Sequence, residues 1–399
     1  MMLPYGRQCI DADDVAAVVA ALRSDYLTTG PVVEKFETAL AARAGAEHAI
    51  ACSSGTAALH LAAMALGLGP NDVAIVPSMT FMATANVVRL TGAEIVFSDV
   101  DEEAGLMRPD DLAAALKAAG NRRPRCVLPV HLNGQTADIA GLSKVAAAHE
   151  VSIVEDAAHA IGARTTVDLK SADPVGRCSH SAMTAFSFHP VKTITMGEGG
   201  AVTTNDVRLA ARLQQLRNHG ITRNPAEFLD RTAGFDDRGT VNPWYHEMHD
   251  PGLNYRASDL HCALGLSQLN KLDRFVATRR ALAARYDTML ADLAPLVRPV
   301  KRVPHCEPAW HLYSILIDFA SLGIQRAELI RRLREKGVGT QVHYIPVHRQ
   351  PYYRARYGDL SLPGADAYYA RQLSLPLFPT MTDNDVDRVV DALKSIVHA

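Results

Sequence analysis

The stretch EHAIACSSGTAALHLAAMALGLG, residues 47–69, holds a predicted strand, a turn of small residues and a predicted helix in direct succession. Residues 47–54 have the short apolar pattern of a strand, and residues 56–68 have the pattern of a helix that ends at Gly67 or Gly69. The order of strand, turn and helix recurs along the chain, and this recurrence decides the fold.

From about residue 10 to residue 205, predicted helices and strands alternate. The first helix covers residues 11–25, with Val15, Val18, Val19 and Leu22 on one face. The strands are rich in β-branched residues and lack a clear alternation of apolar and polar positions, which is typical of a mostly parallel sheet covered by helices. Beyond the first unit, strands are predicted at 73–77, 93–100, 125–132, 151–157, 184–188 and 199–204, and helices at 81–92, 112–119 and 139–149.

The pattern changes near residue 250. A long helical pattern with a bend covers residues 257–290, and it is followed by strands at 311–319 and 338–347 and helices at 326–337 and after Thr382. The sequence therefore predicts an α/β fold with a large domain, residues 1–249 including an N-terminal arm, and a small C-terminal α+β domain, residues 250–399.

Composition and charge narrow the class of protein. The chain has 399 residues, 48% of them hydrophobic and 21% charged, as in ordinary globular proteins. The net charge of −2 argues against nucleic acid as a partner. The six cysteines are scattered without a CxxC pair, so neither a metal site nor a disulfide scaffold is expected, and a reducing, cytoplasmic location fits. No signal peptide and no apolar run long enough to cross a bilayer are expected.

Two turns after predicted strands suit a flat, anionic ligand, because ligands gather at the carboxyl ends of parallel strands. Ser54, Gly55 and Thr56 open a helix, where free N–H groups and hydroxyls can bind an anion. An ordinary helix N-cap is an equally good interpretation. Phe81 stands at the next strand-to-helix junction and can stack on a flat ring, although core packing is the better interpretation of Phe81 alone.

Asp156 ends the buried strand at 151–157, and a carboxylate in that position needs a partner. A pyridinium nitrogen is one such partner, because opposite charges keep each other ionised. His159 follows by one helical turn and can contact the same ligand. The competing interpretation is that Asp156 caps a following helix.

Lys192 lies in FSFHPVKTITMGEGGAVTT, residues 186–204, among aromatic, hydroxyl and glycine residues. A lysine must lose its proton to form a Schiff base, and an apolar setting lowers the lysine pKa in the required direction. Ser187 lies on the strand before it. A solvated loop lysine is the competing interpretation. Taken together, an anion cradle, a ring stacker, a pyridinium partner and an imine-forming amine are what pyridoxal 5′-phosphate requires.

The motifs SSGTAAL, EDAAHA, FSFHPVKTITMGEGGAVTTND and LNYRASDLHCALGLSQLNKL resemble those of the DegT/StrS-type sugar aminotransferases, over nearly the whole chain. The resemblance implies the fold-type-I architecture of aspartate aminotransferase, with a sheet of the seven-stranded type, and a homodimer with shared active sites. It implies that Lys192 binds the cofactor as a Schiff base and Asp156 pairs with its pyridine nitrogen. It places other residues around the cofactor: His159 near the ring, Phe81 stacked on it, Ser54, Gly55, Thr56 and Ser187 at the phosphate, and Asn254 at the phosphate from the neighbouring subunit.

Four further stretches, PYGRQCIDADDVAAVVAALRSDYLTTGP, NPWYHE, HLYSILI and GVGTQVHYIPVHRQPYY, are similar to the 4-aminotransferases of pseudaminic acid synthesis. That similarity implies amination of a UDP-linked 4-keto-6-deoxy-N-acetylhexosamine by L-glutamate, with the cofactor passing through its pyridoxamine form. The candidate substrate contacts are Tyr5, Thr28, His343 and Tyr344. Arg256 suits an anion or a structural ion pair equally well. The polar segment 222–251, with Trp244 and Tyr245, either reaches over a substrate pocket or is a plain surface loop.

Other functions remain open. A 3- or 4-aminotransferase for a dTDP- or GDP-linked keto-deoxysugar has the same general motifs. A sugar dehydratase of this fold carries histidine where Lys192 stands. A non-catalytic, cofactor-binding regulator needs a partner or DNA-binding module, and the sequence shows no basic recognition helix. A dinucleotide-dependent oxidoreductase needs GxGxxG after the first strand. The sequence therefore favours a pyridoxal-phosphate-dependent nucleotide-sugar aminotransferase.

Overall fold

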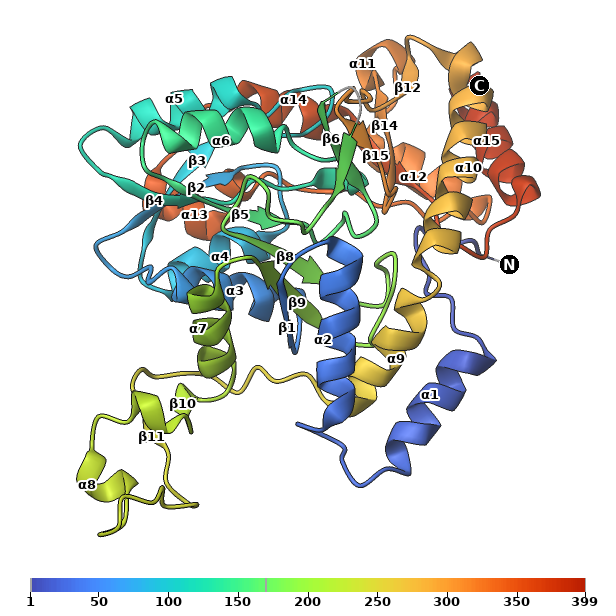
Figure 1. Cartoon of the computed structure of the whole chain (residues 1–399). Helices are drawn as coiled ribbons and strands as arrows, with labels where there is room; N and C mark the ends of the chain where they lie inside the picture. Colours follow the sequence, from blue (N-terminus) through green and yellow to red (C-terminus); the bar gives the residue numbers. More distant parts are fainter. Residues whose placement is uncertain (1, 169–170, 399) are drawn as a thin grey trace.

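A computed structural model describes residues 2–168 and 171–398, which form a large α/β unit and a smaller α+β unit (Figure 1). The large unit is built on a seven-stranded sheet in the order β1-β9-β8-β5-β4-β2-β3. Neighbouring strands pair in parallel except at β9, which is antiparallel to β1 and β8. The mostly parallel sheet expected from the sequence is confirmed. Its strands are β1 (His48–Cys52), β2 (Val73–Pro77), β3 (Glu94–Ser98), β4 (Pro124–Val127), β5 (Ser152–Asp156), β8 (Met183–Ser187) and β9 (Gly200–Thr204).

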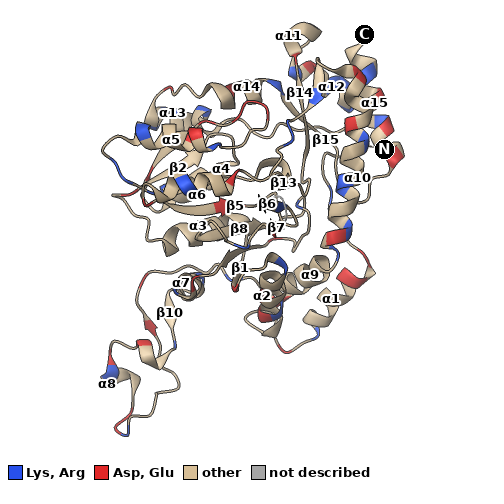
Figure 2. Cartoon of the chain, turned by 45° about the horizontal axis from the view of Figure 1, so that its top comes forward, with Lys and Arg blue, Asp and Glu red and all other residues tan. Residues whose placement is uncertain are grey.

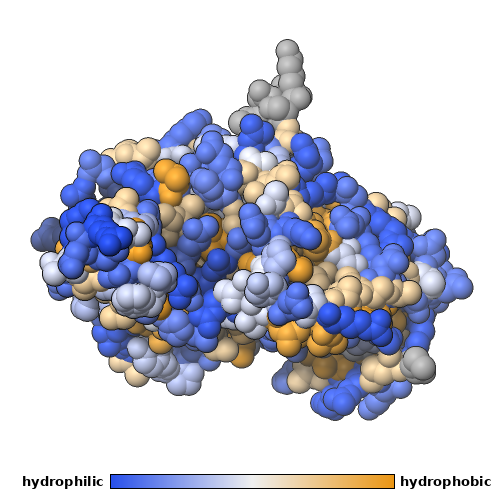
Figure 3. Space-filling model, turned by 60° about the horizontal axis from the view of Figure 1, so that its bottom comes forward, coloured by the Kyte–Doolittle hydropathy of each residue, from blue (hydrophilic) through white to orange (hydrophobic). Residues whose placement is uncertain are grey.

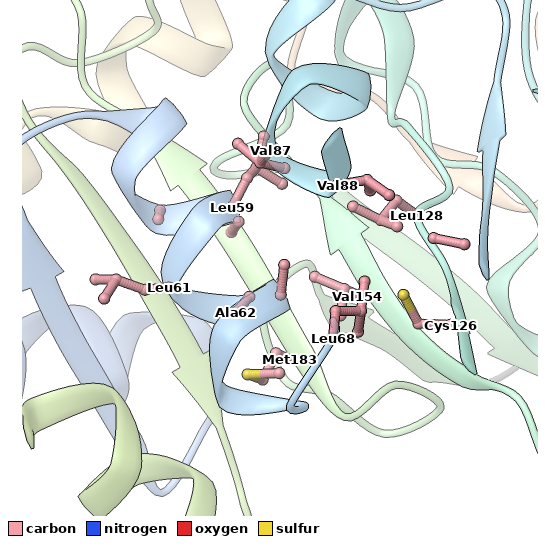
Figure 4. Packing of buried hydrophobic residues seen from close by; sticks show 14 of the residues in the cluster. Leu59, Leu61, Ala62, Leu68, Val87, Val88, Cys126, Leu128, Val154 and Met183 are labelled. Atoms are coloured by element: carbon pink, nitrogen blue, oxygen red, sulfur yellow. The ribbon is translucent and has the colours of Figure 1, made fainter. Parts of the chain in front are cut away.

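Helices cover both faces of this sheet, which explains why its strands lack an alternating pattern. Ile50 and Val76 pack in a cluster with α3, α4 and α7, and Figure 4 shows this cluster from close by. Their chain neighbours Ala51 and Ile75 belong to clusters on the other face, with α2, α5 and α6. The helices of the large unit are α1 (Ala12–Leu22), α2 (Pro31–Ala44), α3 (Gly55–Ala65), α4 (Met82–Leu90), α5 (Pro109–Ala119), α6 (Ile139–Ala147) and α7 (Val207–Arg217). Separately, β6 (Arg164–Asp168) pairs with both β7 (Ser171–Pro174) and β13 (Cys306–Glu307) in a small antiparallel sheet.

Helix α1 buries a different face from the one that its apolar pattern indicates. Val15 and Leu22 are each 55% exposed, whereas Asp14 is buried. Asp14 accepts a hydrogen bond from Gln268 at 2.7 Å and pairs with Lys271 at 2.8 Å. Polar contacts therefore attach α1 to α9 (Asp259–Leu269) and to Lys271 just after it, and Val15 and Leu22 face outward. Apolar residues are visible at the lower face of the molecule in Figure 3.

The smaller unit is a three-stranded antiparallel sheet, β12-β14-β15, packed against helices. Its core cluster includes Tyr313 and Leu393, and Leu3 of the N-terminal arm belongs to the same cluster. Basic and acidic residues are interspersed on α10 and α15 (Figure 2), where Arg285 pairs with Asp387 at 2.6 Å. The elements that follow α9 in the chain are α10 (Leu272–Leu290), β12 (Val297–Pro299), β14 (Tyr313–Ile317), α11 (Phe319–Leu322), α12 (Arg326–Glu335), α13 (Pro351–Tyr357), α14 (Pro363–Arg371), β15 (Gln372–Leu375) and α15 (Asp383–Val397). Of these, α13 packs against the large unit through Tyr353.

The prediction of a strand at residues 338–347 is wrong. In this part of the described chain, Val338 and Gln341 make single bridge pairs and no regular strand forms. The side chains of His343 and Tyr344 both line one cavity, and a strand would send consecutive side chains to opposite faces.

The division of the chain at residue 250 stays a prediction. Helix α9 packs against α1 and α2 of the large unit. Val347 and Tyr353, much later in the chain, belong to the core cluster of α3 and α4. The C-terminal part of the chain therefore contributes side chains to both units.

Residues 220–252 form an arm that projects from the body at the lower left of Figure 1. The arm contains the paired strands β10 (Ile221–Thr222) and β11 (Glu247–Met248) at its base and the short helix α8 (Arg231–Gly234). The ring of Phe228 lies 4.9 Å from that of Tyr245, so the arm has a small aromatic core. Trp244 is 73% exposed, so apolar surface remains uncovered on the arm.

Candidate active site

A cavity of about 490 Å³ lies where β5 and β8 end and where α3 and α4 begin. Residues that are far apart in the sequence meet here, as expected at the carboxyl ends of parallel strands. The predicted site residues that line the cavity are Tyr5, Ser54, Gly55, Thr56, Phe81, Asp156, His159, Ser187, Lys192, His343 and Tyr344.

The turn before α3 brings its backbone close to β8. The Ser54 side chain caps α3 by accepting the N–H of Ala57 at 3.1 Å, so the N-cap interpretation is confirmed for this side chain. A Cβ on Gly55 would lie 2.6 Å from the Cβ of Ser187, a distance that only glycine avoids. The N-terminus of α3 and the hydroxyls of Thr56 and Ser187 border the same cavity, which suits a phosphate group.

Asp156 is held at the end of β5 by two hydrogen bonds. Its Oδ2 accepts from the hydroxyl of Thr84 at 2.7 Å, and its Oδ1 accepts from the N–H of Ala158 at 3.1 Å. The residues after Asp156 form a turn and not a helix, so Asp156 is not a helix cap and His159 lies on that turn. Thr84 was not predicted, because a threonine inside a helix carries no signal that distinguishes it from core packing.

Lys192 lies in the turn between β8 and β9, and its backbone N–H donates to the carbonyl of His189 at 2.9 Å. Its side chain is partly buried in the cavity. Burial lowers the pKa of Lys192 to about 8, and the nearby charge of Asp156 opposes that change. The amine is therefore not a freely solvated loop lysine, and a useful fraction of it is uncharged near neutral pH.

Two histidines beside Lys192 are uncharged near neutral pH. Burial, with a further contribution from Lys192, lowers the pKa of His159 well below its usual value and that of His343 to about 3. His159 Nε2 lies 3.0 Å from the hydroxyl of Tyr344, and burial raises the pKa of Tyr344. Phe81 is 52% exposed and lines the cavity, so the interpretation of Phe81 as core packing is wrong.

Three predicted residues do not line this cavity. Thr28 pairs with Ser258 through an isolated bridge, and Asn254 pairs with Asn218 in the same way. Arg256 donates to the side chain of Asn218 at 2.6 Å, and no carboxylate of the described residues pairs with it. The arm at 220–252 does not line the cavity either. The roles of these residues toward a ligand stay predictions, including that of Asn254 from a neighbouring subunit.

Sequence reasoning missed other residues of the lining. His311, Glu198 and Gln350 line the cavity. His311 directly precedes the β14 region, inside a stretch whose alternating pattern predicted only a strand. The single sequence therefore gave no signal that its side chain faces Lys192 and not the core of the small unit.

The model of the DegT/DnrJ/EryC1/StrS aminotransferase family matches residues 8–394. The chain belongs to this family. It is 39% identical over 398 residues to the spore coat polysaccharide biosynthesis protein SpsC of Bacillus subtilis (strain 168), covering 99% of this chain and 97% of that protein. Its structure is similar to that of Helicobacter pylori PseC, an aminotransferase involved in the biosynthesis of pseudoaminic acid, with a TM-score of 0.87 and 27% identity over the full length of both chains.

A further similar structure bears on the cofactor. The putative sugar aminotransferase Spr1654 from Streptococcus pneumoniae matches in its pyridoxal-phosphate form with a TM-score of 0.86 and 27% identity, covering 100% of this chain and 99% of that chain. The same protein also matches in its pyridoxamine-phosphate form. The protein is thus a sugar aminotransferase that depends on pyridoxal phosphate, which confirms the family, fold class and cofactor predicted from the motifs.

The residues of the cavity fit this cofactor. The close approach at Gly55 leaves a cradle at the N-terminus of α3, Asp156 presents a buried carboxylate, and Lys192 presents an amine with a lowered pKa. No cluster of potential metal ligands is found among residues 2–168 and 171–398. Across the same residues, every helix is too short or too polar to cross a membrane.

Proposed function

We propose that the protein transfers the amino group of L-glutamate to a UDP-linked 4-keto-6-deoxy-N-acetylhexosamine, giving the 4-amino sugar of the pseudaminic acid pathway. One observation carries the proposal: Tyr5, His343 and Tyr344 line the same cavity as Lys192. These three residues come from two of the stretches that are similar to the 4-aminotransferases of pseudaminic acid synthesis. The similarity to PseC over the full length of both chains supports it.

Lys192 and Asp156 have the central roles in this proposal. The cofactor, when bound, supplies an electron sink that stabilises negative charge on the substrate carbon. Lys192 Nζ would remove the proton from the α-carbon of glutamate and pass it to the cofactor, and in the second half-reaction it would deliver a proton to the sugar carbon that gains the amino group. Its lowered pKa suits both proton transfers. Asp156 presents its carboxylate to the pyridinium nitrogen, with Thr84 fixing the orientation of that carboxylate.

The lining of the cavity suits an uncharged sugar. Among the described residues that line it, the charged side chains other than histidine are Lys192, Asp156 and Glu198, and no arginine is present. Tyrosine, serine and uncharged histidine side chains can bind sugar hydroxyls. The diphosphate of the nucleotide must be neutralised outside this lining. We also propose, from the family resemblance, a homodimer in which Asn254 and the arm at residues 220–252 of one subunit complete the site of the other.

A second candidate substrate is a dTDP- or GDP-linked keto-deoxysugar, because the family motifs are common to aminotransferases of such sugars. The identity to SpsC, at 39%, exceeds the 27% identity to PseC, so the similarity to PseC does not exclude this candidate. Both candidates use the same Lys192 chemistry and differ only in the nucleotide and the sugar.

The test incubates the purified holoenzyme with L-glutamate and a panel of UDP-, dTDP- and GDP-linked keto-sugars, and follows 2-oxoglutarate and the mass of the sugar product. We expect the UDP-linked sugar to gain an amino group fastest. Faster amination of a dTDP- or GDP-linked sugar would refute the UDP assignment. Lys192→Ala should abolish turnover, whereas Lys117→Ala on the exposed face of α5 should not change it. Normal turnover by Lys192→Ala would refute the mechanism for every substrate.

A further inference from the structure

His311 is a buried histidine of the cavity that the mechanism above does not use. Its side chain is 4% exposed and lines the cavity together with Lys192 and His159. Its Nδ1 is enclosed and has no hydrogen-bond partner among the described residues. Burying an unpaired imidazole costs free energy, so its position needs a reason other than its own hydrogen bonds.

The ring of His311 packs against the ring of His159. Their centroids lie 4.4 Å apart, with the ring planes inclined at 50°. His159 has few other restraints, since Tyr344 holds its Nε2 at 3.0 Å and its enclosed Nδ1 has no partner in the described chain. The orientation of the His159 ring is therefore set by Tyr344 at one edge and by His311 on its face.

A buried arginine holds His311 in turn. Arg279 of α10 is 0% exposed, and its NH1 donates to the carbonyls of His311 at 3.1 Å and Leu377 at 2.9 Å. The same NH1 lies 3.3 Å from the carbonyl of Trp310. No carboxylate pairs with Arg279 in the described part of the chain. The charged guanidinium of Arg279 therefore contacts the main chain around His311. Its positive charge also disfavours protonation of the His311 imidazole.

The loop of His311 is also fixed from the large unit. The N–H of His311 donates to the carbonyl of Asn133 at 3.0 Å, and that of Ala309 donates to Gly134 at 3.0 Å. A Cβ on Gly134 would collide with the carbonyl of Ala309, and φ at Gly134 is 95°. Glycine is thus required for this close approach, which fixes the backbone of His311 from two sides.

We propose that His311 is a positioning residue of the active site, which holds the imidazole of His159 by ring packing, and that Arg279 holds His311 through its main-chain carbonyl. The effect of His311 on the reaction rests on the aminotransferase function proposed above. Its effect on cofactor binding does not depend on which sugar is the substrate. His311 acts on the bound cofactor through His159 and not by direct contact.

The test measures the affinity for pyridoxal phosphate by equilibrium dialysis and the pH midpoint of the visible absorbance of the holoenzyme. His311→Ala should weaken cofactor affinity by about tenfold and move the midpoint, whereas His311→Phe keeps a packing ring and should stay within about twofold of wild type. Arg279→Lys, which cannot reach all three carbonyls, should change both readouts in the direction of His311→Ala. The control is His305→Phe, because His305 lies in the same connection between β12 and β14 but contacts the carbonyl of Thr136 outside the cavity.

A double-mutant cycle decides whether His311 acts through His159. In a His159→Ala background, His311→Ala should change cofactor affinity by less than about twofold. An equal loss in both backgrounds would overturn the proposal, because a purely structural role would be additive. A loss in His311→Phe as large as that in His311→Ala would also overturn it, since a nitrogen of His311 would then make the contact. Either result leaves the sugar assignment to be judged by the substrate panel alone.

Discussion

Replacing Lys192 by methionine should stabilise the cofactor-free protein at neutral pH. Burial in the cavity lowers the pKa of Lys192 to about 8 in the folded protein, whereas the unfolded chain restores the ordinary value of 10.5. Between these two values the unfolded state binds more protons than the folded state, so the free energy of unfolding rises with pH through this window. Below pH 8 the folded protein bears the full cost of the charged amine.

The two pKa values set the size of the effect. The cost of keeping Lys192 in the folded protein is roughly 3 kcal/mol at pH 7 and falls to about 1.4 kcal/mol at pH 9.5. The amine faces an open cavity and is only partly buried, so solvent screening makes both figures upper bounds. Methionine has a similar length and carries no charge, and its stability advantage over lysine should therefore shrink by up to about 2 kcal/mol between these pH values.

Urea unfolding of the cofactor-free proteins at pH 7.0 and 9.5 measures this difference. The quantity compared is the difference in free energy of unfolding between wild type and Lys192→Met at each pH, because the contributions of the other titrating groups are the same in both proteins and cancel. Lys117→Met, on the exposed face of α5, is the matched control and should show the same difference from wild type at both pH values. An advantage of Lys192→Met that does not change with pH would refute the lowered pKa and, with it, the assignment of Lys192 as the reactive amine.

Three further substitutions test other contacts. Phe81→Ala should leave the melting temperature nearly unchanged, since the ring is 52% exposed, but should weaken cofactor binding several-fold in equilibrium dialysis, because an aromatic contact is lost. Thr84→Val removes the hydroxyl that donates to Asp156 and should cost about 1–3 kcal/mol of cofactor binding free energy. Thr84→Ser keeps a hydroxyl and should retain most of the cofactor affinity. Equal affinities of the two variants would contradict a role for this hydrogen bond. Leu393→Ala empties a fully buried position of the small unit and should lower the free energy of unfolding by about 2–5 kcal/mol in urea, while Leu229→Ala on the arm, 81% exposed, should change it by less than about 0.5 kcal/mol.

The parts of the fold that depend on local pattern could be predicted from the sequence. The strands and helices around residues 47–204 follow from apolar runs and turn residues, and they place Asp156 and Lys192 at one edge of the sheet. Helix α2 was not predicted, although Pro31 begins it and Gly45 follows it.

What could not be predicted depends on tertiary contacts. The 338–347 segment was predicted as a strand, yet consecutive side chains line the cavity, and nothing local reveals that cavity. The buried Asp14 on α1 reverses the expected inner face, because Gln268 and Lys271 lie far away in the sequence. His311 and Thr84 act through partners that only the folded chain brings near them.

The base of the arm has a consequence for protein engineering. The N–H of His219 donates to the carbonyl of Leu253 at 3.0 Å, and a Cβ on Gly220 or on Gly252 would collide with the backbone of the opposite segment. The chain therefore leaves the body and returns to it at nearly the same point, as in an inserted module. We expect that the arm can be excised and its ends joined by a short linker, leaving a body that still folds and presents the cavity without the segment proposed to reach the second subunit.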